Sequence, residues 1–187
     1  MIFFREIEFD DAEMILKWRI NPLVDQWMLH RVENDLNKQK AWIEMMRSNE
    51  LSYHWITVSD VHDIAYVKFD ELNKDSKSAT AGFYIGENLY SFLTINILHS
   101  FYIALFIHLG LTSIFADVFD GNKILKIHTF SGYEPYLEKT PIVINHGSSS
   151  HLLKRYVLRK EKFLCKHNIK NIPELPMQLW DAKPFAH

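Results

Sequence analysis

The chain has 187 residues and a formal net charge of −2, and 48% of its residues are hydrophobic while 24% are charged. This length is typical of one domain with a sizeable core, and the composition excludes disorder and low complexity. The small net charge gives no global electrostatic reason to expect nucleic acid as a partner. The single cysteine, Cys165, excludes an internal disulfide and a cysteine-rich metal site.

Neither of the two apolar stretches that were candidates for targeting or membrane segments has the required pattern. The opening MIFF is followed at once by Arg5 and Glu6, so we expect no signal peptide. The longest apolar stretch, residues 93–111, contains Asn96, Ser100 and two histidines and is too polar to predict a transmembrane helix. We therefore expect a cytoplasmic protein without a membrane partner.

The first 50 residues predict a short strand followed by two helices. Residues 2–8 form the strand, and Asp10 or Asp11 caps a helix whose apolar positions recur at helical spacing. Pro22 ends this helix, because a proline disfavours helical backbone in the residue before it. The second helix runs from residue 34 or 36 to residue 47.

Three strands separated by polar turns follow. Residues 52–59, 64–72 and 79–85 are rich in β-branched and aromatic residues, and the segments DVHD and NKDSK between them are typical of turns. We expect these strands to form an antiparallel sheet with the N-terminal strand beside them.

The most informative segment is residues 81–133. The strand AGFYIGE is followed by the loop NLYSF, an amphipathic helix at residues 94–109, a strand at residues 113–119 and a second helix. A strand that leads into a helix N-terminus forms an anion site, since unpaired backbone N–H groups and the helix dipole both point there. A second strand and helix beside the first complete a V-shaped cleft for a long, thin ligand.

The end of the chain predicts a last pair of strands and a tail. Residues 132–144 and 151–159 flank the loop NHGSSS, and a short helix from Lys160 leads into an irregular extension with three prolines.

The order of these elements, with LGL before the strand at residues 113–119 and GY after the second helix, resembles the core of the GCN5-related N-acetyltransferases (GNAT). The resemblance implies an α/β (α+β) fold, in which a mixed sheet of six to seven strands splays open between strands 4 and 5 and is flanked by about four helices. It also implies acetyl-CoA as co-substrate, with its pyrophosphate on the loop after strand 4. We expect residues 1–163 to form the acyltransferase domain and residues 164–187 to be a C-terminal extension.

The N-terminal half is similar to one branch of this family. The segment WRINP at residues 18–22, followed by Trp27 and Met28, resembles the WRN-x-P…WM segment of the RimJ/RimL-like branch, which acetylates protein N-termini. The same segment occurs in bacterial enzymes of the pseudaminic acid pathway that acetylate nucleotide-linked amino sugars, and the layout is closest to these. The resemblance implies that Trp27, His30 and Glu33 bind the acceptor.

The loop that would hold the pyrophosphate departs from the family pattern Arg/Gln-x-x-Gly-x-Gly/Ala. The matching span, YSFLTI, contains no glycine, arginine or lysine. Glycines let backbone amides approach a phosphate closely, and a β-carbon at each position restricts that approach. The donor-binding residues that the resemblance implies are Tyr84 and Ile85 for the pantetheine arm, with Ser91, Phe92, Leu93, Thr94 and Ile95 for the pyrophosphate.

The second helix departs from the family pattern N-x-x-A-x-x-x-Y-x-x-x-G-F, in which the tyrosine protonates the leaving thiolate. The tyrosine position, four residues before Gly132, is His128, which as an imidazolium would be a stronger acid than a phenol. Asn122 matches, displaced by one residue, the asparagine that contacts the pantetheine arm. Asp117 takes the position of a glutamate in the resembling amino-sugar enzymes and is a candidate base, acting directly or through water. His30 and Glu33 are the other candidates.

Three functional classes remain. The first is an acyltransferase that moves an acetyl group from acetyl-CoA to a primary amine, either of a small molecule such as a nucleotide-linked amino sugar or of a protein N-terminus. The second is a binding or scaffolding domain that has lost donor binding, and the third is a transferase with a non-CoA donor.

The sequence has no HExxH, GxSxG or Walker motif, so we expect no metal site and no serine hydrolase or nucleoside triphosphatase activity. It is compatible with a homodimer.

Overall fold

The structure, a computed structural model, describes residues 2–146, 149–167 and 175–176. The first half of the chain forms β1 (Ile2–Glu6), α1 (Ala12–Arg19), α2 (Pro22–Asp25), α3 (Leu36–Arg47), β2 (Tyr53–Ser59), β3 (His62–Asn73) and β4 (Ser78–Ile85). The second half forms α4 (Thr94–Ile107), β5 (Ser113–Phe119), α5 (Ile124–Ser131), β6 (Glu134–Pro135), β7 (Ile142–His146), β8 (Ser149–Arg159) and α6 (Lys160–Lys166). Two 3-10 helices, η1 (Phe9–Asp11) and η2 (Asn88–Leu93), precede α1 and α4.

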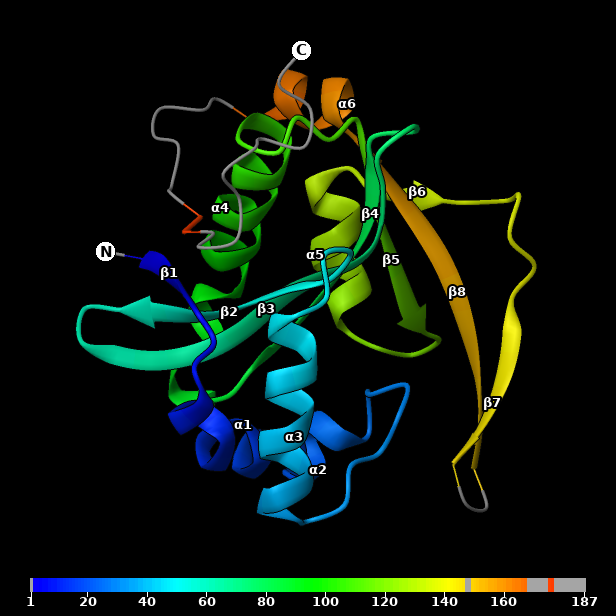
Figure 1. Ribbon diagram of the computed structural model, residues 1–187. Helices are drawn as coiled ribbons and strands as arrows, with labels where there is room; N and C mark the ends of the chain where they lie inside the picture. The colour runs from blue at the N-terminus through cyan, green and yellow to red at the C-terminus, as the bar shows by residue number, and fades with distance from the viewer. Residues whose placement is uncertain (1, 147–148, 168–174, 177–187) are drawn as a thin grey trace.

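The strands form one mixed sheet with helices on both faces (Figure 1). Within the described residues the order is β1-β2-β3-β4-β5-β8-β6, and β7 also pairs with β8. Side chains alternate between the two faces of a strand, and so the sheet has two cores. Helices α1 to α3 cover one core, while α4 and α5 cover the other.

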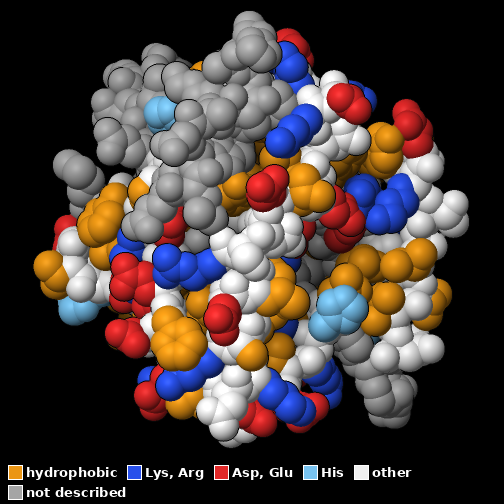
Figure 2. Space-filling view, viewed as in Figure 1, with side chains coloured by type: hydrophobic (Ala, Val, Ile, Leu, Met, Phe, Trp, Pro, Cys, Tyr) orange, Lys and Arg blue, Asp and Glu red, His pale blue; other side chains and the backbone are white. Residues whose placement is uncertain are grey.

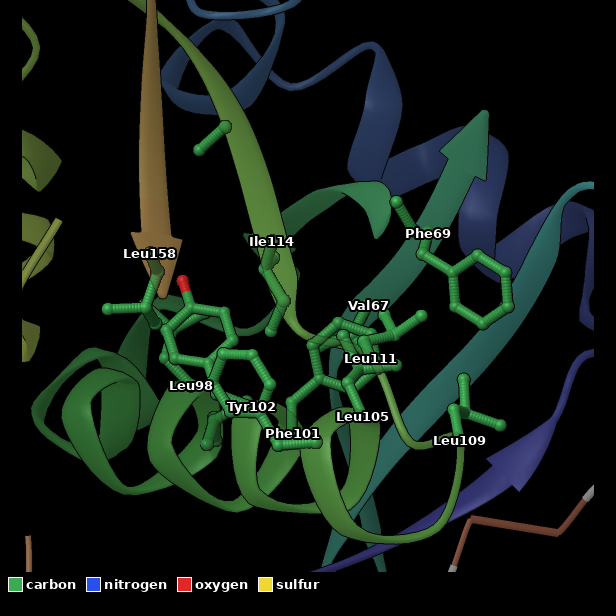
Figure 3. Close-up of a cluster of buried hydrophobic side chains, with 14 of the residues drawn as sticks. Val67, Phe69, Leu98, Phe101, Tyr102, Leu105, Leu109, Leu111, Ile114 and Leu158 are labelled. Carbon is green, nitrogen blue, oxygen red and sulfur yellow. The ribbon is translucent and has the colours of Figure 1, made fainter. Parts of the chain in front are cut away.

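The larger core lies between α4 and the sheet (Figure 3). The buried face of α4 includes Leu98, Phe101, Tyr102 and Leu105, which meet sheet residues such as Ile114. Burying one such side chain stabilises the fold by about 1.5–3 kcal/mol. Residues Asn88–Ile107 have the length and composition of a membrane-crossing helix. The burial of the α4 part of this stretch against the sheet accounts for its apolar residues, as in the core helix of a globular domain.

The splay between β4 and β5 is confirmed. The two strands pair in parallel over only three positions, from Ser78↔Ser113 to Thr80↔Phe115. Beyond these pairs β4 continues to Ile85 and β5 to Phe119 without pairing to each other. The sheet therefore opens into a V whose arms are the second halves of the two strands.

A smaller feature of β4 explains how its end is fixed. A Cβ on Gly86 would lie 2.1 Å from Cδ2 of Trp18, so only glycine admits this close approach of the indole. The indole Nε1 then donates to Oε1 of Glu87 at 3.0 Å. Trp18 thus packs in the α1–α3 core and holds the strand end at the same time.

Two details of this fold differ from the sequence prediction. Pro22 ends α1 but also starts α2, because Oδ1 of Asn21 accepts the Leu23 N–H at 3.0 Å and proline is tolerated in a first helical turn. The strand predicted at residues 132–144 is two short strands, β6 and β7. Pro135 and Pro141 interrupt it, since proline has no N–H for a sheet hydrogen bond. The sheet consequently has eight strands in the described residues instead of six or seven.

The division into a domain and an extension stays a prediction, because most of residues 164–187 lies outside the described residues. Helix α6 crosses the expected boundary, and Phe163 in it is fully buried. Leu175 packs against the larger core, and the Pro176 carbonyl accepts the Trp55 Nε1–H at 2.8 Å.

Candidate active site

The edge of β4 that faces β5 is open beyond Thr80. The register of the two strands ends at Thr80↔Phe115, so residues 81–85 have no pairing partner on β5, all of which is described. An extended ligand with amide groups can pair with an open strand edge as an added strand does. This edge therefore fits the pantetheine arm of a CoA donor.

The chain then passes through η2 to the N-terminus of α4, where the first backbone N–H groups have no helical partner. Thr94 is buried, and its Oγ1 donates its one proton to the Ser91 carbonyl at 2.6 Å. In this conformation the hydroxyl proton of Thr94 is used within the chain, and the contact of Thr94 with a phosphate stays a prediction. Leu89 and Phe92 are 86% and 75% exposed, so apolar side chains flank the expected anion site.

His128 on α5 is buried, and its ring faces α4. Its ring centroid is 4.7 Å from that of Tyr133 and 6.3 Å from that of Phe83, and its Nδ1 is 3.3 Å from the Tyr102 hydroxyl. Burial lowers the pKa of His128 to about 4, so the ring is neutral near pH 7. The expectation of an imidazolium acid at this position is therefore wrong. A catalytic role for the neutral ring stays a prediction.

Two expected donor contacts have structural roles. Oδ1 of Asn122 accepts the Ile124 N–H at 3.0 Å and caps the start of α5. The Tyr84 ring stacks on that of Tyr66, with 4.8 Å between centroids and 14° between planes, inside the α1–α3 core. The backbone of Tyr84, and not its ring, belongs to the open edge.

Asp117 lies in an ion-pair network that spans the place where β4 and β5 part, which we call the clasp. Arg155 on β8 donates from Nε to Oδ1 of Asp117 at 2.8 Å and from Nη2 to Oδ2 at 2.6 Å. Nη2 of Arg155 also lies 3.1 Å from Oε2 of Glu71, which accepts the Thr80 hydroxyl at 2.6 Å. Both oxygens of Asp117 are thus hydrogen-bonded to a permanent cation, and its role as the base stays a prediction.

A second polar cluster, which we call the polar chain, was not predicted from the sequence. It consists of Lys68, Asp70, Ser52, His54 and Tyr66. Lys68 donates to Oδ2 of Asp70, and Ser52 donates to Oδ1 of the same carboxylate. Ser52 Oγ is 2.9 Å from Nε2 of His54, whose Nδ1 meets the Tyr66 hydroxyl. Burial lowers the pKa of His54 to about 4. The chain leads from the half-exposed Lys68–Asp70 pair into the α1–α3 core.

The expected acceptor residues lie on the segment between α2 and α3. Trp27 is half-buried and His30 is exposed, and the His30 carbonyl accepts a bond from Arg19 at 2.7 Å. Glu33 forms an exposed pair with Lys38 at 2.5 Å. The structure places these residues together on one segment, and their contact with an acceptor stays a prediction.

No cluster of three potential metal ligands occurs among the residues that the structure describes. A pocket of about 100 Å³ lies where β1, β2 and the end of α3 meet, away from the V. Its lining includes Glu6, Arg47, Asn49, Ser52 and His54.

No protein-family model matches the chain, and no curated protein matches it in sequence. The fold does match solved structures. The spermidine N-acetyltransferase from Vibrio cholerae in complex with CoA and spermine is 15% identical, with a TM-score of 0.78 over 87% of this chain and 98% of that one. A dodecameric structure of the spermidine N-acetyltransferase from Vibrio cholerae in an intermediate state is 14% identical, with a TM-score of 0.73 over 89% and 98% of the two chains. The splayed mixed sheet and these matches give the chain the fold of the GCN5-related N-acetyltransferases.

Proposed function

We propose that the protein is an N-acetyltransferase that moves an acetyl group from acetyl-CoA to a primary amine of a small molecule. The observation that carries the proposal is the open edge of β4, which leads directly to the N-terminus of α4. This edge suits the amides of a pantetheine arm and the helix N-terminus suits its pyrophosphate. A solved structure of the same fold is a complex with CoA, which supports the same donor here.

The reaction needs a base for the acceptor ammonium, a donor to the thioester carbonyl and a proton for the departing thiolate. A backbone N–H of the open edge, near Tyr84 and Ile85, serves as the carbonyl donor. The neutral His128 offers an Nε2–H to the sulfur when Tyr102 donates to Nδ1, so its role is to hydrogen-bond the leaving group. Water takes the proton of the acceptor ammonium and supplies the proton that the thiolate takes.

We propose a nucleotide-linked amino sugar as the first acceptor to test. Beside the clasp, the rings of Phe115 and Tyr136 lie 4.9 Å apart, and Lys139 is 3.8 Å from Asp117. Aromatic rings stack on sugars and bases, and lysine and arginine bind phosphates. The resemblance of the WRINP segment to the amino-sugar branch supports the same class.

A polyamine is the second acceptor class, because the solved structures of this fold include spermidine N-acetyltransferases. A polycation binds best to carboxylates without cation partners. Here Asp117 and Glu71 are paired with Arg155, and Asp70 with Lys68. Figure 2 shows acidic and basic side chains interspersed over the face in view, without a large acidic patch. The charge pattern therefore ranks polyamines below amino sugars.

A second candidate function is a binding domain without donor, or a transferase with a donor other than CoA. The exposed Leu89 and Phe92 favour it, because apolar side chains stand where a pyrophosphate would need polar contacts. Residues 88–95 also carry no lysine or arginine.

Donor binding decides between the two candidates. Calorimetric titrations with CoA, dephospho-CoA and pantetheine, together with melting curves in acetyl-CoA, measure it directly. A ligand at 100 times its dissociation constant stabilises the fold by about 2.7 kcal/mol. Binding of CoA that is lost with pantetheine supports the acetyltransferase with a working pyrophosphate site. Folded protein that binds none of the three ligands contradicts it.

The acceptor is then found by a thiol-release assay with acetyl-CoA and four amines. A UDP-linked 4-amino sugar represents the first class and spermidine the second, and a peptide with a free N-terminus and glucosamine serve as comparisons. Turnover with the UDP-sugar alone supports the proposed acceptor. Preference for spermidine or for the peptide contradicts it.

A further inference from the structure

The side chain of Lys68 lies on the strand that borders the open edge of β4. Lys68 on β3 is the register partner of Gly82, which lies two residues beyond the last β4–β5 pair. A Cβ on Gly82 would come within 3.0 Å of Cε of Lys68, so the lysine stem runs directly over the glycine. Its amine is therefore held beside the segment of β4 that the proposed donor arm occupies.

The carboxylate that faces this amine is held in place by the polar chain. Asp70 is fixed by Ser52, which is in turn fixed by His54 and Tyr66 of the polar chain. The side chains of Lys68 and Asp70 are 35% and 31% exposed, so the pair is accessible from solvent. A lysine has four rotatable bonds and a single charged nitrogen, and it leaves a carboxylate more readily than a bidentate arginine does. Asp70 can therefore lose its cation partner more readily than Asp117 can.

We propose that Lys68 is a self-acetylation site, with Asp70 as its base. Asp70 takes a proton from the Lys68 ammonium, and the free amine attacks the thioester carbonyl carbon of acetyl-CoA. The N–C bond forms and the C–S bond breaks, and the second proton of the amine nitrogen passes, directly or through water, to the departing thiolate. The product is a neutral amide that no longer pairs with Asp70. This inference rests on the proposed function, because the thioester donor must occupy the V.

The chain contains a matched control for Lys68. Lys154 on β8 is also 35% exposed and is also paired with an aspartate, with Nζ 3.0 Å from Oδ1 of Asp120. General chemical acetylation affects both lysines according to exposure and charge, whereas acetylation from the V affects Lys68 alone. The ratio of the two rates therefore isolates the enzymatic contribution.

The test is peptide mass spectrometry of the full chain after timed incubation with acetyl-CoA, with acetyl phosphate as a chemical reagent in a parallel arm. We expect the Lys68 to Lys154 rate ratio to be at least tenfold higher with acetyl-CoA than with acetyl phosphate. Asp70→Asn should lower the Lys68 rate at least tenfold without changing the Lys154 rate, and Asp120→Asn should leave the Lys68 rate unchanged. Ser52→Ala, which keeps Asp70, should lower the Lys68 rate less than Asp70→Asn does.

A second measurement, which does not depend on turnover of acetyl-CoA, accompanies this test. Saturating CoA should slow the reaction of Lys68 with acetyl phosphate several-fold and leave Lys154 unaffected, because the thiol end of CoA covers Lys68. Equal rate ratios in the acetyl-CoA and acetyl phosphate arms, or no protection by bound CoA, would overturn the inference while amine turnover upholds the proposed function. Absence of any acetyl-CoA binding would overturn both.

Discussion

The guanidinium of Arg155 holds both carboxylate oxygens of Asp117, and thereby joins β8 to β5 beside the point where β5 leaves β4. The same guanidinium reaches Glu71, which is bonded to Thr80 at the last paired position of β4. The clasp thus links β3, β4, β5 and β8 where the sheet loses its backbone hydrogen bonds. We infer that it fixes the width of the V.

We expect Asp117→Asn to lower the free energy of unfolding by about 1–3 kcal/mol, because it leaves the largely buried Arg155 without its main counter-charge. Turnover should stay within a few-fold, since the proposed mechanism does not use Asp117 as the base. Urea unfolding and thiol release measure the two effects. Asp120→Asn, which breaks an exposed pair, is the control and should cost less than about 1 kcal/mol. A stable Asp117→Asn protein with turnover reduced 100-fold would instead make Asp117 the base.

Gly82 on β4 and Gly86, the residue that follows β4, give a second prediction. We expect Gly86→Ala to destabilise the fold by more than about 2 kcal/mol, because the new Cβ overlaps the rigid indole of Trp18. Gly82→Ala should cost less, because its Cβ meets the flexible stem of Lys68. Chemical unfolding of both variants tests this order. Equal losses would contradict the claim that the Trp18 contact fixes the end of β4.

The sequence was sufficient to predict the elements in which apolar residues recur with a clear helical or strand spacing. The apolar spacing of residues 94–109 and the alternation at residues 113–119 predicted α4 and β5 to within two residues, and both were confirmed. The order of β4, α4 and β5 along the chain then predicted where the sheet opens. The elements that it missed depend on single residues: Pro22 starts a helix as well as ending one, and Pro135 and Pro141 divide a strand.

The polar chain was hidden because it depends on a β-bulge. The turn between β2 and β3 sets the register Ser59↔His62, and extending that register would place Ser52 opposite Phe69. A bulge between Thr57 and Val58 shifts the pairing by one residue, which brings Ser52 to the level of Asp70 and onto the same face of the sheet. A sequence pattern does not show such a shift, and so neither Asp70 nor His54 could be predicted as a site residue.

The buried histidines predict acid sensitivity. Burial lowers the pKa of His54 and His128 to about 4 in the folded state, whereas an unfolded histidine has a pKa of about 6.5. Between these values the unfolded chain binds more protons, so stability is lost as the pH falls from 6.5 towards 4. We expect each ring to contribute a loss on the order of 2 kcal/mol between pH 7.5 and pH 5. Urea unfolding at both pH values measures it, and His128→Gln should show a smaller pH-dependent loss. An unchanged loss would mean that His128 is accessible to protons in the folded state.

The final prediction concerns the exposed Phe92 at the expected pyrophosphate site. Phe92→Lys adds a cation to residues 88–95, which contain no lysine or arginine. The same substitution removes an exposed apolar ring near the N-terminus of α4. A charge-assisted hydrogen bond to a phosphate is roughly twice as strong as a neutral one, so we expect CoA to bind several-fold more tightly and pantetheine to be unaffected. The gain in CoA affinity should shrink at high salt, because the new interaction is exposed.

Leu137→Lys is the matched control, since Leu137 is 90% exposed and lies in the segment between β6 and β7. Calorimetric titration of both variants at low and high salt measures these effects. An equal gain for the two variants would reflect net charge alone, and no gain for Phe92→Lys would show that the pyrophosphate does not lie at the start of α4.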